Sequence, residues 1–168
     1  MTDSRAAAGR VEWHRAGWDD PRVVALRTAM DGEMADRYRD TEDTFRALVE
    51  PAGTQWWATW VAELDGEPVA TATLRRLGDE RDGLAEVKKV YVAPAGRRRG
   101  LAAAALRLVE DECRARGVDV VHLHTGDRQP EALALYAREG WEREPVFAPY
   151  DVLDVSVCFR KALVPAPR

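Results

Sequence analysis

The spacing of apolar residues predicts that helices and strands alternate along this chain. Between residues 21 and 38 the apolar positions recur every three or four residues, which predicts an amphipathic helix. The Asp19-Asp20-Pro21 run before it supplies an N-cap followed by proline, which is a helix-start signal. The same spacing predicts helices over 101–116 and 129–139, each ended by a glycine. A short helix is also expected over 41–49.

Strand-like composition marks the rest of the chain. The predicted strands cover residues 11–14, 56–64, 69–77, 86–92, 118–125 and 154–163. Asp65-Gly66 predicts a tight hairpin turn between the second and third of these strands. From residue 87 to residue 125 a strand, a helix and a strand follow one another, so the two strands should be parallel neighbours. The pattern therefore predicts an α/β domain with a mixed sheet.

The length of 168 residues fits one domain. We expect a single domain over residues 10–164, with flexible tails at 1–9 and 165–168. No apolar run approaches the ~20 residues needed to span a bilayer, and the N-terminus lacks the apolar segment of a secretory signal. These features predict a cytoplasmic protein without a membrane partner.

Charge and the metal-binding residue types narrow the function further. The formal net charge is -4, whereas a nucleic-acid binder usually carries a broad basic face. The composition therefore disfavours nucleic acid as a partner and weakly favours cationic small molecules. Cys113 and Cys158 lie far apart in apolar stretches, which predicts two buried thiols. His122 and His124 point to one side of a strand but have no third ligand nearby, so we predict packing roles and no metal site.

The segment from Val90 to Ala102 carries the clearest chemistry. A strand ends near Pro94, a loop follows with three arginines and two glycines, and a helix begins at once. Free backbone N–H groups and the positive end of the helix make such a loop a site for a phosphate or pyrophosphate. Arg97-Arg98-Arg99 can add charge-assisted bonds, and Gly100 lets the main chain approach an anion closely. The alternative is a solvated charge run that only forms a turn.

Two common nucleotide motifs are excluded in this loop. It has no Gly-Lys-Ser/Thr, so it is not a Walker-type phosphate loop. It also lacks the Gly-x-Gly-x-x-Gly of a dinucleotide-binding fold.

Three stretches resemble the GNAT superfamily of N-acetyltransferases. Arg97-Arg98-Arg99-Gly100-Leu101-Ala102 is similar to its Gln/Arg-x-x-Gly-x-Gly/Ala signature. The lead-in from Glu86 to Pro94 resembles the strand before that signature. The stretch from Gln129 to Trp141 resembles the family's second coenzyme-contacting helix. Two positions depart from the commonest pattern, because Ala102 stands where glycine is commoner and Gln129 where asparagine often stands.

This resemblance implies a fold and a co-substrate. The implied fold is a mixed, mostly antiparallel sheet with a central parallel strand pair and helices on both faces. The implied co-substrate is acetyl-CoA, whose pantetheine arm lies along a strand that a β-bulge separates from its neighbour. The implied coenzyme-binding residues lie in the strand, the loop and the second helix. They are Val90, Tyr91, Val92, Arg97, Arg98, Arg99, Gly100, Leu101, Ala102, Gln129, Ala132 and Tyr136.

The resemblance also implies direct acetyl transfer to a primary amine, with three candidate groups for proton transfer. Tyr136 matches the tyrosine that the family often uses to protonate the departing thiolate; the alternative is a packing role in the core. Glu86 is the candidate base, acting directly or through water; the alternative is an exposed glutamate at a strand end. Glu33, on the polar side of the first helix, is the reserve candidate base.

The sequence leaves the acceptor and the oligomeric state open. Acidic residues in the two segments expected to form the acceptor site suggest a small cationic amine. These residues are Asp40, Glu42, Asp43, Asp151 and Asp154. The alternatives are a transferase acting on a protein N-terminus or lysine, and a non-catalytic acyl-CoA-binding module. Dimers are common among relatives, which leaves a homodimer possible.

Overall fold

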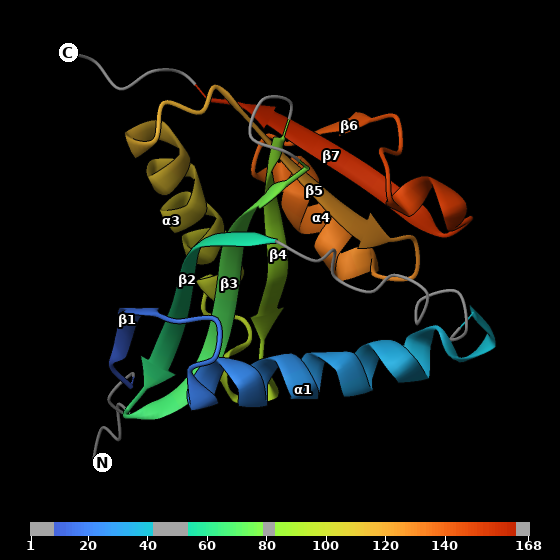
Figure 1. Ribbon diagram of the computed structural model, residues 1–168. Helices are drawn as coiled ribbons and strands as arrows, with labels where there is room; N and C mark the ends of the chain where they lie inside the picture. Colours follow the sequence, from blue (N-terminus) through green and yellow to red (C-terminus); the bar gives the residue numbers. More distant parts are fainter. Residues whose placement is uncertain (1–8, 42–53, 79–82, 164–168) are drawn as a thin grey trace.

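A computed structural model describes residues 9–41, 54–78 and 83–163 (Figure 1). Most of the expected tails and most of the helix expected over 41–49 lie outside these residues. Within the described residues, seven strands form one sheet in the order β1-β2-β3-β4-β5-β7-β6. Their bounds are Val11–Ala16 (β1), Gln55–Leu64 (β2), Glu67–Leu77 (β3), Leu84–Val92 (β4), Val120–Gly126 (β5), Glu142–Glu144 (β6) and Ser156–Ala162 (β7).

The pairing of the strands confirms the mixed sheet. β4 and β5 are parallel, and every other neighbouring pair is antiparallel. The β2–β3 hairpin turns at Asp65 and Gly66, whose φ angles of 52° and 88° are both positive, as a two-residue hairpin turn of this twist requires. The sequence did not predict β6, since three residues are too few to establish an alternating pattern.

The helices begin and end close to where the sequence predicts. They are α1 (Pro21–Arg37), α3 (Leu101–Ala115) and α4 (Pro130–Arg138), with short 3₁₀ turns at Arg39–Thr41 (η1), Pro94–Gly96 (η2) and Tyr150–Val152 (η3). The Asp20 side chain caps α1 by accepting a hydrogen bond from the Arg22 N–H. Gly117 and Gly140 follow α3 and α4 with positive φ angles, which glycine adopts without strain.

Helices cover both faces of the sheet, as the resemblance implies (Figure 1). α1 packs on one face, where Val23 and Leu26 meet Val61 of β2. α3 and α4 pack on the other face and bury the larger apolar cluster, to which α3 contributes Leu106 and α4 contributes Tyr136. Both cysteines are buried as free thiols, which confirms the prediction for them.

β4 separates from β5 partway along its length. The two strands pair only over Ala85–Val87, and their arrows diverge beyond that point in Figure 1. On its other edge β4 stays paired with β3, but the register shifts by one residue between Lys88 and Tyr91. Lys89 has a φ of 55° within this shift, which marks a β-bulge in β4. The bulge and the separation that the family resemblance implies are both present.

The two histidines of β5 have separate partners. The Nδ1 atom of His122 lies 2.8 Å from a Glu144 carboxylate oxygen. The Nε2 atom of His124 lies 2.9 Å from the Ser156 hydroxyl, and its ring stacks on Tyr150 with 3.8 Å between ring centroids. No cluster of three metal-ligating side chains occurs in the described part of the chain. Within the same ranges, no helix is both long and apolar enough to cross a membrane.

We predict that His124 makes the stability of the fold depend on pH. Burial, and to a lesser extent the charge of Lys88, lower the pKa of His124 from 6.5 to about 3. Between these values the unfolded chain binds a proton that the folded chain does not. The free energy of unfolding therefore falls as the pH is lowered from 6.5 towards 3, by up to about 1.4 kcal/mol per pH unit from this residue.

Urea unfolding at several pH values between 7 and 4 measures this dependence. The variant His124→Gln keeps a polar group near Ser156 but cannot be protonated, so its stability should fall less steeply than that of the wild type. Equal slopes for His124→Gln and the wild type would contradict the prediction.

Candidate functional site

The loops that follow β4 and β5 emerge at the same end of the sheet because these strands are parallel. The loop after β4 leads into α3, and the loop after β5 leads into α4. The N-termini of both helices therefore open at the end where the two strands diverge. The edge of β4 beyond Val87, which includes Val90, Tyr91 and Val92, pairs with no strand on the β5 side among the described residues.

The loop before α3 has the backbone of an anion site. Arg97 has a φ of -66°, whereas Arg98 and Gly100 have φ angles of 63° and 72°. The extended backbone of Arg97 and the left-handed backbone of Arg98 and Gly100 turn the chain sharply just before the helix. Gly100 is the N-cap of α3 and provides no side-chain acceptor, so the first N–H groups of the helix, from Leu101 and Ala102 onwards, are left without a side-chain cap. These features fit a phosphate or pyrophosphate group.

A second glycine brings this loop against the sheet. A Cβ atom at Gly96 would lie 2.9 Å from the Cβ of Val69 in β3, which is too close for a side chain. Glycine at this position lets η2 lie directly on the sheet and fixes where the following loop starts.

The three arginines of the loop are not equivalent. Arg97 donates two hydrogen bonds from Nη2 to the Glu33 carboxylate, at 2.7 and 2.8 Å, and one from Nε to the Val92 carbonyl at 3.1 Å. The side chains of Arg98 and Arg99 are exposed. Arg98 and Arg99 are therefore better placed than Arg97 to meet an anion from solvent.

The start of α4 brings together the other predicted coenzyme-binding residues. Gln129 is the N-cap of α4 and makes no side-chain capping bond. Ala132 and Tyr136 follow at helical spacing and lie on one side of the helix. Tyr136 packs on Trp141 and Phe159, and burial raises the pKa of its hydroxyl to about 12. The Tyr136 ring thus belongs to the core, as the packing alternative proposes, while its hydroxyl keeps its proton at neutral pH.

Glu86 lies inside a polar cluster on the α1 side of the sheet. Its side chain is 0% exposed, so the alternative of an exposed strand-end glutamate is wrong. The Arg75 guanidinium donates to Glu86 at 2.8 Å, and the Tyr150 hydroxyl donates to it at 2.5 Å. Lys88 and Arg75 each donate to the Tyr150 oxygen at 3.0 Å. The cluster therefore joins two cations, a carboxylate and a phenol where β4 and β5 begin to separate.

Sequence reasoning missed Arg75, Lys88 and Tyr150. A signal for Arg75 is present, because an arginine that directly follows the apolar run of a central strand needs a buried partner. The register of β3 on β4, which places Arg75 beside Glu86, supplies that partner. No local pattern marks Tyr150, which reaches the cluster from η3 through the packing of the segment before β7.

Glu33 lies apart from this cluster. Its carboxylate accepts hydrogen bonds from Arg97 and, at 2.7 Å, from the Tyr91 hydroxyl. The structure therefore places the reserve candidate base at the loop before α3 and the main candidate base where β4 and β5 begin to separate.

The acidic residues expected at the acceptor site do not form one cluster among the described residues. Asp40 is paired with Arg128 through two hydrogen bonds. Asp151 and Asp154 are exposed, and Glu42 and Asp43 lie outside the described residues. The charges nearest Glu86 are instead those of Arg75 and Lys88, so the structure gives no support for a cationic acceptor.

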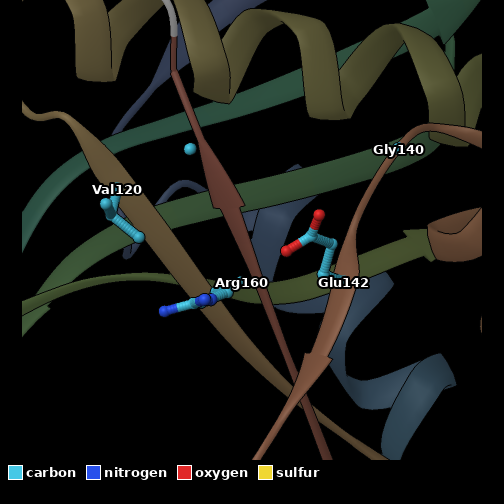
Figure 2. Close-up of a pocket in the computed structure, with 5 residues that line it drawn as sticks. Val120, Gly140, Glu142 and Arg160 are labelled. Carbon is cyan, nitrogen blue, oxygen red and sulfur yellow. The ribbon is translucent and has the colours of Figure 1, made fainter.

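Figure 2 shows a surface hollow at a different place. Its lining residues are Val120, Gly140, Glu142, Arg160 and Ala162. β5 begins here and β7 ends here, which puts the hollow at the opposite end of the sheet from the loop before α3. None of the predicted site residues lines it, and we assign no function to it.

The geometry defines what the site can hold. An extended chain that carries amide groups can pair with the open edge of β4, as a strand would. A pyrophosphate attached to such a chain would meet the N–H groups and arginines of the loop before α3. The polar cluster of Glu86 lies where that edge begins.

Curated relatives agree with this arrangement. An IAA acetyltransferase from Azospirillum brasilense is 34% identical over 85 residues, which are 51% of this chain and 56% of that protein. The uncharacterized N-acetyltransferase YjgM from Escherichia coli K12 is 30% identical over 122 residues, which are 72% of this chain and 73% of that protein. The match thus spans little more than half of the first relative and nearly three quarters of the second.

Solved structures share the fold. A Klebsiella pneumoniae protein provisionally assigned as an acyl-CoA N-acyltransferase superposes with a TM-score of 0.71 at 27% identity, over 92% of this chain and 98% of that chain. A GNAT family acetyltransferase from Elizabethkingia anophelis, solved with acetyl-CoA bound, gives a TM-score of 0.64 at 15% identity, over 91% of this chain and 98% of that chain.

A family model matches most of the chain. Residues 19–141 match the model described as the acetyltransferase (GNAT) family. That stretch contains β4, the loop before α3 and all of α4. With its diverging parallel strands and its uncapped helix N-terminus, the chain belongs to the GNAT family of acetyltransferases.

Proposed function

We propose that this protein transfers an acetyl group from acetyl-CoA directly to a primary amine, most simply that of a small molecule. One observation carries the proposal: the open edge of β4 leads into an arginine-rich loop and an uncapped helix N-terminus. This combination suits a long ligand with amides in its arm and a pyrophosphate at its end, which describes coenzyme A.

The coenzyme-binding roles follow the residues in space. Backbone groups of Val90–Val92 would pair with the pantetheine arm, since the side chain of Tyr91 is buried against α1. The amides of residues 98–102 and the side chains of Arg98 and Arg99 would hold the pyrophosphate. Gln129, Ala132 and Tyr136 of α4 would contact the coenzyme from the opposite side of the gap between the strands.

Tyr136 is proposed as the acid of the reaction. As the amine nitrogen bonds to the acetyl carbon, the carbon–sulfur bond breaks and the thiolate needs a proton. A hydroxyl with a pKa of about 12 is protonated at neutral pH and can donate to that sulfur. The core packing of the ring does not conflict with this role, because it fixes the direction of the hydroxyl.

Glu86 is proposed as the base, reached through Tyr150. Because Glu86 is fully enclosed, an amine would not contact it directly. The Tyr150 hydroxyl already donates to Glu86, so it can pass its proton to the carboxylate and take one from the amine. Arg75 and Lys88 donate to the same oxygen and would stabilise negative charge on it during transfer.

The acceptor class is tested by a panel of amines. Acetyl-CoA consumption is followed with polyamines, amino sugars, amino-acid derivatives, a peptide with a free N-terminus and a lysine peptide. Turnover with a small amine supports the proposal, and turnover with the peptides alone would place the acceptor on a protein. Tight coenzyme binding without turnover of any amine would favour a non-catalytic acyl-CoA-binding module.

We predict that Arg98 and Arg99 contribute directly to coenzyme affinity. Replacing both by alanine should raise the dissociation constant of CoA about tenfold or more, because two charge-assisted contacts to phosphate are lost. Calorimetric titration measures the change. The control is the double variant Arg107→Ala/Arg138→Ala, which loses the same amount of positive charge from exposed sites on α3 and α4. It should bind CoA with the affinity of the wild type. If CoA affinity fell equally in both double variants, the net charge of the protein and not direct contact by Arg98 and Arg99 would determine the affinity, and the prediction would be wrong.

We predict that Tyr136→Phe lowers kcat about tenfold or more and leaves CoA affinity nearly unchanged. Phenylalanine preserves the ring packed on Trp141 and Phe159, so only the hydroxyl is lost. Steady-state rates at saturating acetyl-CoA, together with calorimetry, measure the two effects. Unaltered turnover in this variant would remove Tyr136 from the acid role.

We predict that Tyr150→Phe and Glu86→Gln both lower kcat, and that Glu86→Gln also destabilises the fold. Removing the carboxylate leaves the buried Arg75 charge without this partner, which typically costs about 3–5 kcal/mol of stability. Tyr150→Phe keeps the Arg75–Glu86 ion pair, so its effect on rate is separable from folding. Rates and urea unfolding are measured together. A normal rate in a folded Tyr150→Phe variant would exclude the relay.

A further inference from the structure

α1 runs across the end of the sheet where β4 and β5 diverge (Figure 1). Its Glu33 side chain accepts from Arg97 in the loop before α3 and from Tyr91 in β4. Arg37, one turn further along the same side of the helix, is ion-paired with Glu131 in the first turn of α4. A single helix thus contacts both segments proposed to bind the coenzyme.

The contacts of Glu33 hold Arg97 in one place. The guanidinium is bound between the Glu33 carboxylate and the Val92 carbonyl at the end of β4, with distances of 2.7 to 3.1 Å. The Glu33 and Arg97 side chains are 31% and 44% exposed, so the pair is partly shielded from water. Burial, and then the Glu33 carboxylate, raise the pKa of Tyr91, which keeps its hydroxyl a donor in this group.

When a loop binds an anion through backbone N–H groups, its affinity for the anion depends on the shape of the loop. Arg98 adopts a positive φ, which is uncommon for a non-glycine residue. Arg97 is the residue immediately before it, and the contact with Glu33 fixes one end of this turn. Affinity rises when a site is already in its binding shape, because less ordering accompanies binding.

We propose that Glu33 is a positioning residue for the coenzyme: it holds Arg97 against the end of β4 and so fixes the loop before the pyrophosphate binds. Arg97 then supports the shape of the loop, and Arg98 and Arg99 are the arginines that contact the phosphates. This inference rests on the proposed function.

The direction in which coenzyme affinity changes when Glu33 is removed distinguishes a positioning role from a long-range electrostatic effect. Glu33 is negative, so a long-range effect alone would make its removal strengthen the binding of an anionic ligand. The positioning role predicts the reverse, since the loop loses its fixed end. It also differs from the role of a base, whose loss would lower kcat without changing coenzyme affinity.

The experiment is a calorimetric titration of CoA into the wild type and a set of folded variants. Glu33→Ala should raise the dissociation constant about fivefold or more, and Glu33→Asp should fall between it and the wild type. Arg97→Ala should weaken binding to a similar extent. The dissociation constant of CoA for the Glu33→Ala/Arg97→Ala variant should not exceed that of the single variant that binds CoA less tightly, because both changes remove the same contact.

Glu63→Ala is the matched control. Glu63 pairs with Arg22, so its removal also loses an ion pair between α1 and the sheet but leaves the loop untouched. Thermal unfolding shows whether Glu63→Ala and Glu33→Ala lose similar amounts of stability. Glu63→Ala should bind CoA with the affinity of the wild type.

Each other outcome has a distinct meaning. No binding of CoA by the wild type would overturn the proposed function itself. Binding by the wild type with unchanged or tighter binding by Glu33→Ala would overturn the positioning role alone. Additive losses in the double variant would also overturn it, because they would make Arg97 an independent ligand.

Discussion

β4 hydrogen-bonds to β5 over only three residues, and the extra residue at the bulge near Lys89 then carries its backbone away. A central strand whose edge is left open is unusual, because open edges invite pairing with other chains. Here the open edge is partly exposed and runs towards the N-termini of α3 and α4. The position of the loop before α3, the direction of α4 and the place of the polar cluster all depend on this divergence.

Electrostatics divide the site into two parts. At the loop before α3 the charges are partly exposed, and Glu33 offsets the positive charge of Arg97 while Arg98 and Arg99 remain open to solvent. Around Glu86 the charges are buried, so each must be paired: Arg75 offsets the carboxylate, and Tyr150 links both to Lys88. The first arrangement suits the capture of an anion, and the second suits proton transfer away from water.

The order of the elements and the loop before α3 were predictable because their signals are local. Asp20-Pro21, Asp65-Gly66 and Gly117 each act on the residues beside them, and the structure places the corresponding cap, turn and helix end there. The arginine loop was found for the same reason. The buried state of Glu86 was not predictable, since it depends on Arg75 of the neighbouring strand and on Tyr150, 64 positions away in the chain. The bond between Glu33 and Arg97 likewise spans 64 positions and leaves no trace in either local sequence.

In the proposed complex the coenzyme lies along the open edge of β4 and ends at the loop before α3. Hydrogen–deuterium exchange of the backbone amides, with and without saturating CoA, tests it most directly. We expect CoA to slow exchange in residues 88–102 and at the start of α4, and to leave exchange in β1 and in the hollow beside Val120 unchanged. Protection confined to β1 or to that hollow, with residues 88–102 exchanging as before, would contradict it.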